Sequence, residues 1–158
     1  MEGSETRCHT QKEEVMTIQE QEQVRPSDRS AADEIRTHHA AMVAELDRLT
    51  STLLHAGTEV ALPARDELVA WFRDVLVPHA DEEEATSYRA AAALVEGRSL
   101  IEAMTREHVL VKRLVGLFEA AGDVREARAY ARSAFEVFES HQRKENELIL
   151  PLLEAHRP

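Results

Sequence analysis

The sequence predicts an all-α protein, an up-down-up-down bundle of four helices preceded by a polar N-terminal tail. Among its 158 residues there are only five glycines and five prolines, and the abundant Ala, Leu, Glu and Arg favour helices. Apolar residues recur every three or four positions in four successive stretches, which is the period of a helix with one buried face. The connections between these stretches are short, so neighbouring helices should be antiparallel.

Residues 1–29 are polar, rich in Glu and Gln, and hold few large apolar side chains. We therefore expect a disordered or loosely helical tail. The bundle then occupies residues 30–158, a length that suits one domain with its own hydrophobic core.

The first helix should begin after Ser30, because Asp33 follows three residues later and completes a capping box. Gly57 is typical of the position just past a helix end and should close it. The apolar stripe of this helix consists of Ile35, His39, Met42, Leu46, Leu49 and Leu53.

The second helix should begin at Pro63, which is acceptable at a first helical position, and end at Gly97. Pro78 lies inside it and should kink it, because proline lacks the backbone N–H. The stripe of this helix consists of Leu68, Phe72, Val75, His79, Glu83, Thr86, Ala90 and Leu94.

The last two helices have N-terminal signals of the same kind. Ser99 with Glu102 predicts the third start, and Asp123 with Glu126 predicts the fourth. Pro151 should bend or end the last turns of the fourth helix. The stripes are Ile101, Met104, His108, Val111, Val115 and Phe118 in the third helix, and Ala127, Ala131, Ala134, Phe138, His141, Glu145, Leu148 and Leu152 in the fourth.

Each stripe contains a histidine, and two of these histidines have a glutamate one turn later. The residues concerned are His39, His79, Glu83, His108, His141 and Glu145. Buried His and Glu side chains without partners are unfavourable, and a metal ion is the simplest group that satisfies them. A rise of 1.5 Å per residue places the four imidazoles at roughly one depth in the bundle.

The HxxxE spacing by itself is weak support, since about one or two such pairs are expected by chance. The chain has four, because His9–Glu13 and His55–Glu59 also fit the spacing. Those two pairs lie off the core stripes. Position within a stripe, rather than spacing, therefore selects the candidate ligands.

Nitrogen and oxygen donors without thiolate suit iron, manganese or zinc. Six ligands exceed what one tetrahedral ion needs. Two ions bridged by Glu83 and Glu145 use the set more naturally, although a single stripe histidine is more often a hydrogen-bonded core residue.

From Ala31 to His156 the chain resembles the hemerythrin-like (HHE cation-binding) family. The resemblance lies in EIRTHHAAM, VPHADEEE, MTREHVLV and HQRKENELILP, which together form an H…HxxxE…H…HxxxE pattern. It implies that the six residues hold a non-haem centre of two iron ions, bridged by the two glutamates and an oxo or hydroxo group.

The chain departs from the oxygen-carrier members in two ways. Met104 stands where they have the first histidine of HxxxH, and the last carboxylate is Glu145 at four residues rather than Asp at five, where this chain has Asn146. One protein imidazole fewer leaves a metal position open. This favours chemistry with peroxide, nitric oxide or oxygen over reversible oxygen carriage; we interpret Met104 as a packing residue.

Residues beside the predicted ligands were weighed as well. His38 lies about 100° around the helix from His39, and Glu82 could replace Glu83 after a kink, so the sequence leaves open whether either joins the site. Tyr88 and Glu107 could hydrogen-bond ligand imidazoles, but we interpret both as surface residues.

Our main functional hypothesis is a small cytoplasmic protein whose two iron ions handle peroxide, oxygen or nitric oxide, as an enzyme of catalase-like or related type. The alternative is a non-catalytic iron or oxygen sensor, and the third is an interaction protein without metal. A net charge of −11 disfavours nucleic acid and anionic membranes. One cysteine and no apolar leader fit a reducing compartment. The sequence does not specify the metal, the substrate, the oligomeric state or a protein partner.

Overall fold

The computed structural model describes residues 30–156, so the predicted tail, residues 1–29, lies outside the described part, as do residues 157–158. Every element in the described part is helical, which confirms the all-α fold class. The elements are α1 (Ala31–His55), α2 (Thr58–Trp71), the π-helical η2 (Phe72–Leu76), α3 (Val77–Ala85), α4 (Ser87–Ala93), α5 (Arg98–Ala120), α6 (Val124–Lys144), the π-helical η3 (Glu145–Ile149) and α7 (Leu150–Ala155).

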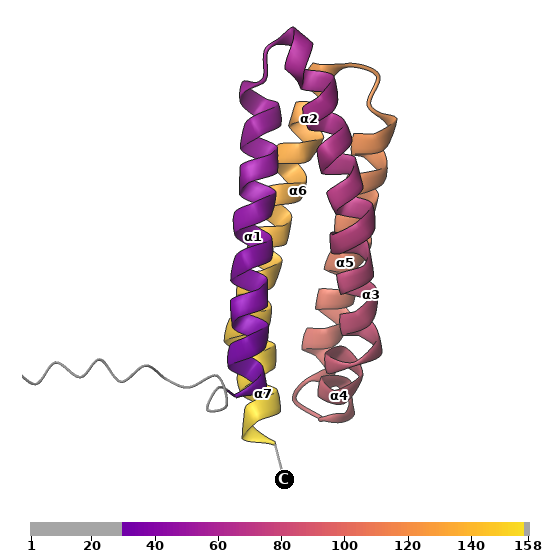
Figure 1. Cartoon of the computed structure of the whole chain (residues 1–158). Helices are drawn as coiled ribbons and strands as arrows, with labels where there is room; N and C mark the ends of the chain where they lie inside the picture. The colour runs from indigo at the N-terminus through magenta and orange to yellow at the C-terminus, as the bar shows by residue number, and fades with distance from the viewer. Residues whose placement is uncertain (1–29, 157–158) are drawn as a thin grey trace, which may run out of the picture.

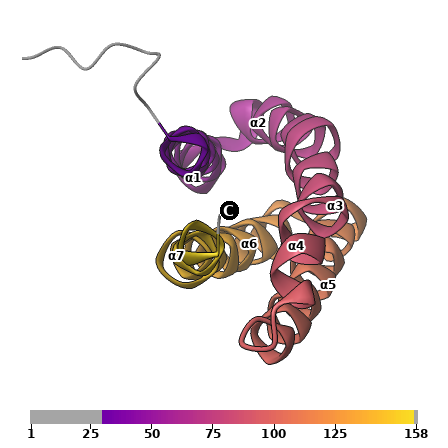
Figure 2. The ribbon, with the colours of Figure 1, turned by 90° about the horizontal axis from the view of Figure 1, so that it is seen from below.

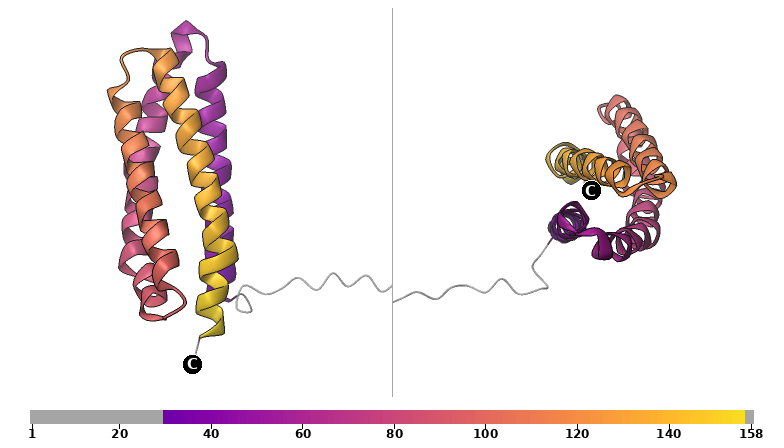
Figure 3. Two further views of the ribbon diagram at one scale, coloured as in Figure 1. Left: turned by 180° about the vertical axis from the view of Figure 1, so that it is seen from behind. Right: turned by 90° about the horizontal axis from the view of Figure 1, so that it is seen from above.

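These elements form four antiparallel arms: α1, then α2 to α3, then α5, then α6 to α7 (Figure 1). Seen from below, the arms stand around a common axis (Figure 2). Seen from behind, α6 lies between α1 and α5 (Figure 3), and it contacts both helices. The predicted up-down-up-down order is confirmed.

The interior contains two apolar clusters, with the histidine layer between them along the helices. The larger cluster includes Leu46, Leu68, Phe72 and Phe118 and fills the end of the bundle near the α1–α2 and α5–α6 connections. Burial of each such side chain contributes about 1.5–3 kcal/mol. The smaller cluster consists of Tyr88, Ala91, Ile101, Met104 and Ile149 at the opposite end. Met104 is 1% exposed, which confirms that it packs in the core.

Two of the predicted helix starts are confirmed by their caps. The Ser30 hydroxyl accepts a hydrogen bond from the Asp33 N–H, and the Asp33 carboxylate accepts from Ser30 in return. The Asp123 carboxylate accepts from the Glu126 N–H at the start of α6. These side chains satisfy backbone donors that a helix leaves unpaired at its first turn.

The predicted start of the second helix at Pro63 is wrong. Helix α2 already begins at Thr58. Gly57 stands just past Ala56, the C-cap of α1, as predicted, and it is also the N-cap of α2. Two extended residues, Ala56 and Gly57, are enough to reverse the chain. Pro63 lies in the second turn and leaves the Glu59 carbonyl without its usual donor; both residues are exposed, so water can replace it.

The predicted start of the third helix at Ser99 is also wrong, because α5 begins at Arg98 with Gly97 as its N-cap. Glu102 pairs with Arg106 instead of completing a capping box. Gly97 lets the backbone pass close to the backbone of Ala91, because a Cβ at this position would lie 2.1 Å from the Ala91 carbonyl oxygen.

Pro78 and Pro151 are each preceded by a π-helical segment instead of a break. Segment η2 ends two residues before Pro78, and η3 ends two residues before Pro151. Each helix continues past its proline, so Pro151 does not end the fourth helix. The wider turn of a π segment shifts the register of the residues after it. As a result Leu148, predicted in the stripe, is 48% exposed, and Ile149 is buried in its place.

The second helix ends earlier than predicted, at Ala85 instead of Gly97. Thr86 leaves helical geometry, with φ −120° and ψ −89°. Helix α4 then turns toward the lower end of α5 (Figure 2). After this break Tyr88 and Ala91 face the interior, whereas the predicted Thr86 and Ala90 are exposed.

Candidate metal centre

The fold brings all six predicted ligands into one layer of the bundle interior. They come from every arm: His39 from α1, His79 and Glu83 from α3, His108 from α5, His141 from α6 and Glu145 from the first position of η3. Five of them are buried, and the His79 side chain is 12% exposed.

The layer divides into two four-residue groups that share both glutamates. His39 and His79 form one group with Glu83 and Glu145, and His108 and His141 form the other with the same two glutamates. Within each group the ligand atoms all lie within 4.8 Å of one another. The two groups therefore meet at Glu83 and Glu145, which lie between the two histidine pairs.

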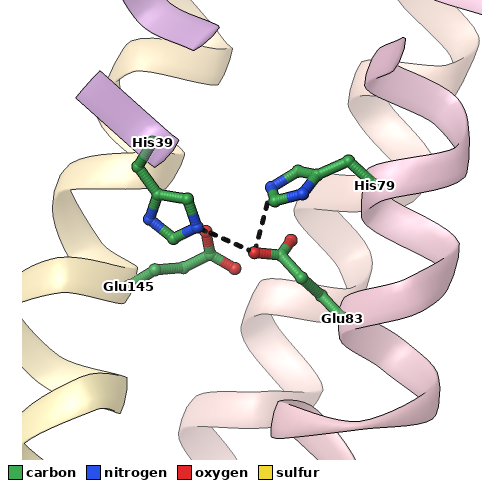
Figure 4. A group of neighbouring side chains, drawn as sticks. All are labelled: His39, His79, Glu83 and Glu145. Atoms are coloured by element: carbon green, nitrogen blue, oxygen red, sulfur yellow. Dashed lines mark hydrogen bonds and ion pairs between the residues drawn. The ribbon is translucent and has the colours of Figure 1, made fainter. Parts of the chain in front are cut away.

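Each oxygen of Glu83 faces a different group. Its Oε1 atom lies 3.2 Å from His39 Nε2 and 3.1 Å from His79 Nε2, so both imidazoles approach the same oxygen (Figure 4). Its Oε2 atom lies 3.5 Å from His108 Nε2. The carboxylate therefore spans the two groups.

Glu145 spans them in the same way from the other side of the layer. Its Oε2 atom lies 3.9 Å from His39 Nε2, and its Oε1 atom lies 3.3 Å from His141 Nε2. The Gln142 amide donates to Oε2 at 2.8 Å and holds the carboxylate in place.

The layer also contains polar atoms that the protein leaves unsatisfied. His79 Nε2 and Glu83 Oε2 are buried without a hydrogen-bond partner among the described residues; the 3.1 Å contact of His79 with Glu83 is an ion-pair distance without hydrogen-bond geometry. An orphaned buried polar atom destabilises by about 1–3 kcal/mol. A cation in each group would satisfy both atoms, so the donor set fits metal ions.

Three of the imidazoles are oriented by a partner on their outer nitrogen. His39 Nδ1 lies 2.9 Å from Asn146 Oδ1. His108 Nδ1 lies 2.9 Å from Glu84, and His141 Nδ1 lies 3.1 Å from Glu107. Such partners turn Nε2 inward and raise the basicity of a ligand imidazole.

The interpretation of Glu107 as a surface residue is therefore wrong. Its carboxylate lies between His141 on α6 and Lys144 one turn later, and it contacts both. The sequence placed Glu107 beside His108, but the partner on another helix could not be identified from spacing within one helix.

Comparison with known families agrees with this geometry. The family model described as the hemerythrin HHE cation binding domain matches residues 30–154. The chain belongs to this family. Searches of curated proteins and of solved structures gave no match. Within the described residues of this hemerythrin HHE domain, no helix combines the length and the apolar character needed to cross a bilayer.

Three residues of this layer, Glu83, His39 and His141, favour their charged forms even without a cation. Burial opposes the charged form of Glu83, but the surrounding histidines, His108 first, outweigh it and hold the pKa of Glu83 well below its usual range. Burial likewise lowers the pKa of His39 and His141, but the neighbouring glutamates outweigh it and raise both pKa values. Metal ions binding here would displace protons from His39 and His141.

Tyr88 is buried beside the layer of predicted ligands, so its interpretation as a surface residue is wrong. It is 2% exposed. Its hydroxyl donates to Glu145 Oε1 at 2.6 Å and lies 3.1 Å from His141 Nε2. Its ring stacks on His108 with centroids 5.0 Å apart and planes 3° from parallel. Burial and the charge of Glu145 raise the pKa of the phenol, which keeps its proton in the absence of a cation.

His38 and Glu82, the two residues left open by the sequence, belong to neither ligand group. Both are exposed. They line a cavity of about 460 Å³ between α1, α3 and the last arm, whose walls also include Ile35, Ile149 and Leu150. Its inner wall reaches His39, His79, Glu83 and Glu145. The cavity therefore connects the surface with one of the two ligand groups.

Proposed function

We propose that this HHE domain binds two iron ions and lets them react with a small oxidant such as peroxide, oxygen or nitric oxide. The observation that supports this most directly is the division of Glu83 and Glu145. Each carboxylate directs one oxygen to the His39 and His79 group and the other to the group opposite.

In this proposal His39 and His79 would hold one ion and His108 and His141 the other, and both ions would share Glu83 and Glu145. The donors are imidazole nitrogen and carboxylate oxygen, which suit iron and are also taken by manganese and zinc. Bound iron supplies Lewis acidity and reversible electron transfer. The chain would contribute the two shared carboxylates and the fixed orientations of three imidazoles.

The reacting molecule would enter through the cavity beside α1 and α3. On that side the protein offers two imidazoles and one oxygen from each glutamate, which is four donors. A hard cation with octahedral geometry takes six. A small molecule could reach these four donors from the cavity, past His38 and Glu82.

Metal analysis of two paired variants tests the ligand set. H79A/E83A removes an HxxxE pair of the core layer, whereas H55A/E59A removes a pair with the same spacing on the surface. His55 and Glu59 are exposed, and His55 Nδ1 bonds to the Ser51 carbonyl. We expect two iron ions per chain in the wild type and in H55A/E59A, and loss of iron in H79A/E83A. Equal iron content in the two variants would contradict the assignment.

Activity is tested on the iron-loaded wild type. We expect its visible spectrum to change with azide, and we expect it to consume peroxide, oxygen or nitric oxide faster than H79A/E83A does. A protein that holds two iron ions but consumes none of these molecules would be the non-catalytic sensor instead.

A further inference from the structure

We propose that Tyr88 is a metal ligand, and that its phenolate oxygen binds the ion held by His108 and His141. This inference rests on the two-ion function proposed above. It adds a seventh protein ligand and assigns it to one ion only.

The Tyr88 hydroxyl lies at the distance from two predicted ligand atoms that is expected of a further ligand on the same ion. Two ligand atoms at a right angle on one ion, with bonds of about 2.1 Å, lie about 3 Å apart. The Tyr88 oxygen lies 3.1 Å from His141 Nε2 and 2.6 Å from Glu145 Oε1. These two atoms are 3.3 Å from each other. The three atoms therefore have the mutual spacing of donors around a single cation.

The two halves of the centre differ in what else can fill their coordination. His39 and His79 face the cavity, but His108, His141 and Tyr88 are not among its lining residues. The second ion would thus be enclosed by protein with two imidazoles and two carboxylate oxygens. On α5, the residue one turn before His108 is Met104, a thioether packed in the same buried cluster as Tyr88. A phenolate oxygen is a much better donor than a thioether for a hard cation.

The fold holds this hydroxyl in place before any metal arrives. The break at Thr86 turns α4 inward, and the parallel stack on His108 fixes the ring. On metal binding the phenol O–H bond breaks, and the oxygen lone pair forms the bond to the cation. The proton, now directed at Glu145 Oε1, leaves to solvent, as protons do when metals bind ionisable ligands. No electron is transferred in this step.

Spectroscopy of the metal-loaded protein tests the proposal, because a bound phenolate absorbs differently from a phenol. The chain has two tyrosines, and Tyr130 is half-buried against the larger apolar cluster, with its hydroxyl 3.5 Å from Glu126. Tyr88→Phe is therefore matched by Tyr130→Phe. Zinc is used as a probe without redox chemistry, and ferric iron as a probe that adds phenolate-to-metal charge transfer.

We expect zinc to produce the ultraviolet difference spectrum of one ionised tyrosine in the wild type and in Y130F, and none in Y88F. Ferric loading should give a visible band whose resonance Raman spectrum contains tyrosinate ring vibrations, again lost only in Y88F. Y88F should also bind one of its two zinc ions more weakly, by more than the about 10–100-fold that loss of an outer hydrogen-bond partner costs. Circular dichroism of the metal-free variants confirms that each is folded.

The measurements distinguish failure of the Tyr88 inference from failure of the proposed metal function. If wild type and Y88F both bind two ions and give identical ultraviolet and Raman spectra, Tyr88 stays a protonated hydrogen-bond donor and this inference is wrong, while the metal function stands. If the wild type binds no metal, the proposed function fails first and the inference fails with it.

Discussion

Stripping the cations from the protein should lower its melting temperature by roughly 10–20 °C. Without metal, His79 Nε2 and Glu83 Oε2 remain buried and unpaired, which destabilises by about 1–3 kcal/mol for each atom. Mass action gives a similar figure, since a ligand at a hundred times its dissociation constant stabilises by about 2.7 kcal/mol for each site. For a domain of this size, about 4 °C corresponds to 1 kcal/mol.

The measurement is a thermal melt followed by circular dichroism. Chelator-treated protein is compared with the same protein after two equivalents of zinc, or of ferrous iron without oxygen. H55A/E59A should show the full shift. H108L/H141L should show little or no shift. Its metal-free form should melt below the metal-free wild type, because Glu83 and Glu145 each lose an imidazole partner and a buried charge without its partner is destabilising.

The reasoning fails if wild type shifts by less than about 2 °C with saturating metal. It also fails if H108L/H141L keeps the whole shift. The first result would show that the layer is satisfied internally, and the second that cations bind elsewhere on this acidic chain.

Further tests address single residues. Gly97→Ala should destabilise by about 1–3 kcal/mol or more in urea unfolding, because its Cβ meets backbone, whereas Gly116→Ala, with open space in α5, should stabilise by about 0.5–1 kcal/mol. Glu107→Gln should weaken zinc binding about 10–100-fold in competition with a chelating dye, and exposed Glu102→Gln should not. Hydrogen bonds to the backbone lower the pKa of Asp123, so the melting difference between wild type and Asp123→Asn should exist near neutral pH and vanish as pH falls through that lowered pKa.

The layer of buried histidines and glutamates could be predicted from the sequence because expected burial, rather than spacing, selected its members. His55 and Glu59 have the same spacing as His79 and Glu83, yet both are exposed at the far end of α1 and the start of α2. The core pairs differ because an apolar residue of the stripe precedes each by one turn, Val75 before His79 and Phe138 before His141. In a helical sequence, a buried ligand can be recognised as an ionisable residue that occupies a position of the apolar stripe.

The residues that orient the imidazoles could not be recognised in this way, because they lie outside the apolar stripes. Glu84 and Glu107 are charged residues beside predicted ligands, which is also how solvated surface residues look in a helical sequence. Their partners, His108 and His141, lie on other helices. Pairing across helices depends on the relative rotation of two arms, and the π segments change that rotation by a register shift that periodicity cannot reveal.

Tyr88 was missed for a related reason. The helical period through Pro78 placed Thr86 and Ala90 inside, and no glycine or proline marks a break between them. The chain nevertheless leaves helical geometry at Thr86, and the Thr86 hydroxyl bonds back to the Glu82 carbonyl, as Ser and Thr side chains do where they compete with the backbone. A continuous helix would keep Thr86 and Ala90 in the layer, whereas the break brings a buried hydroxyl to His141 and Glu145. The least predictable turn in the fold is thus the one that adds an oxygen donor to the centre.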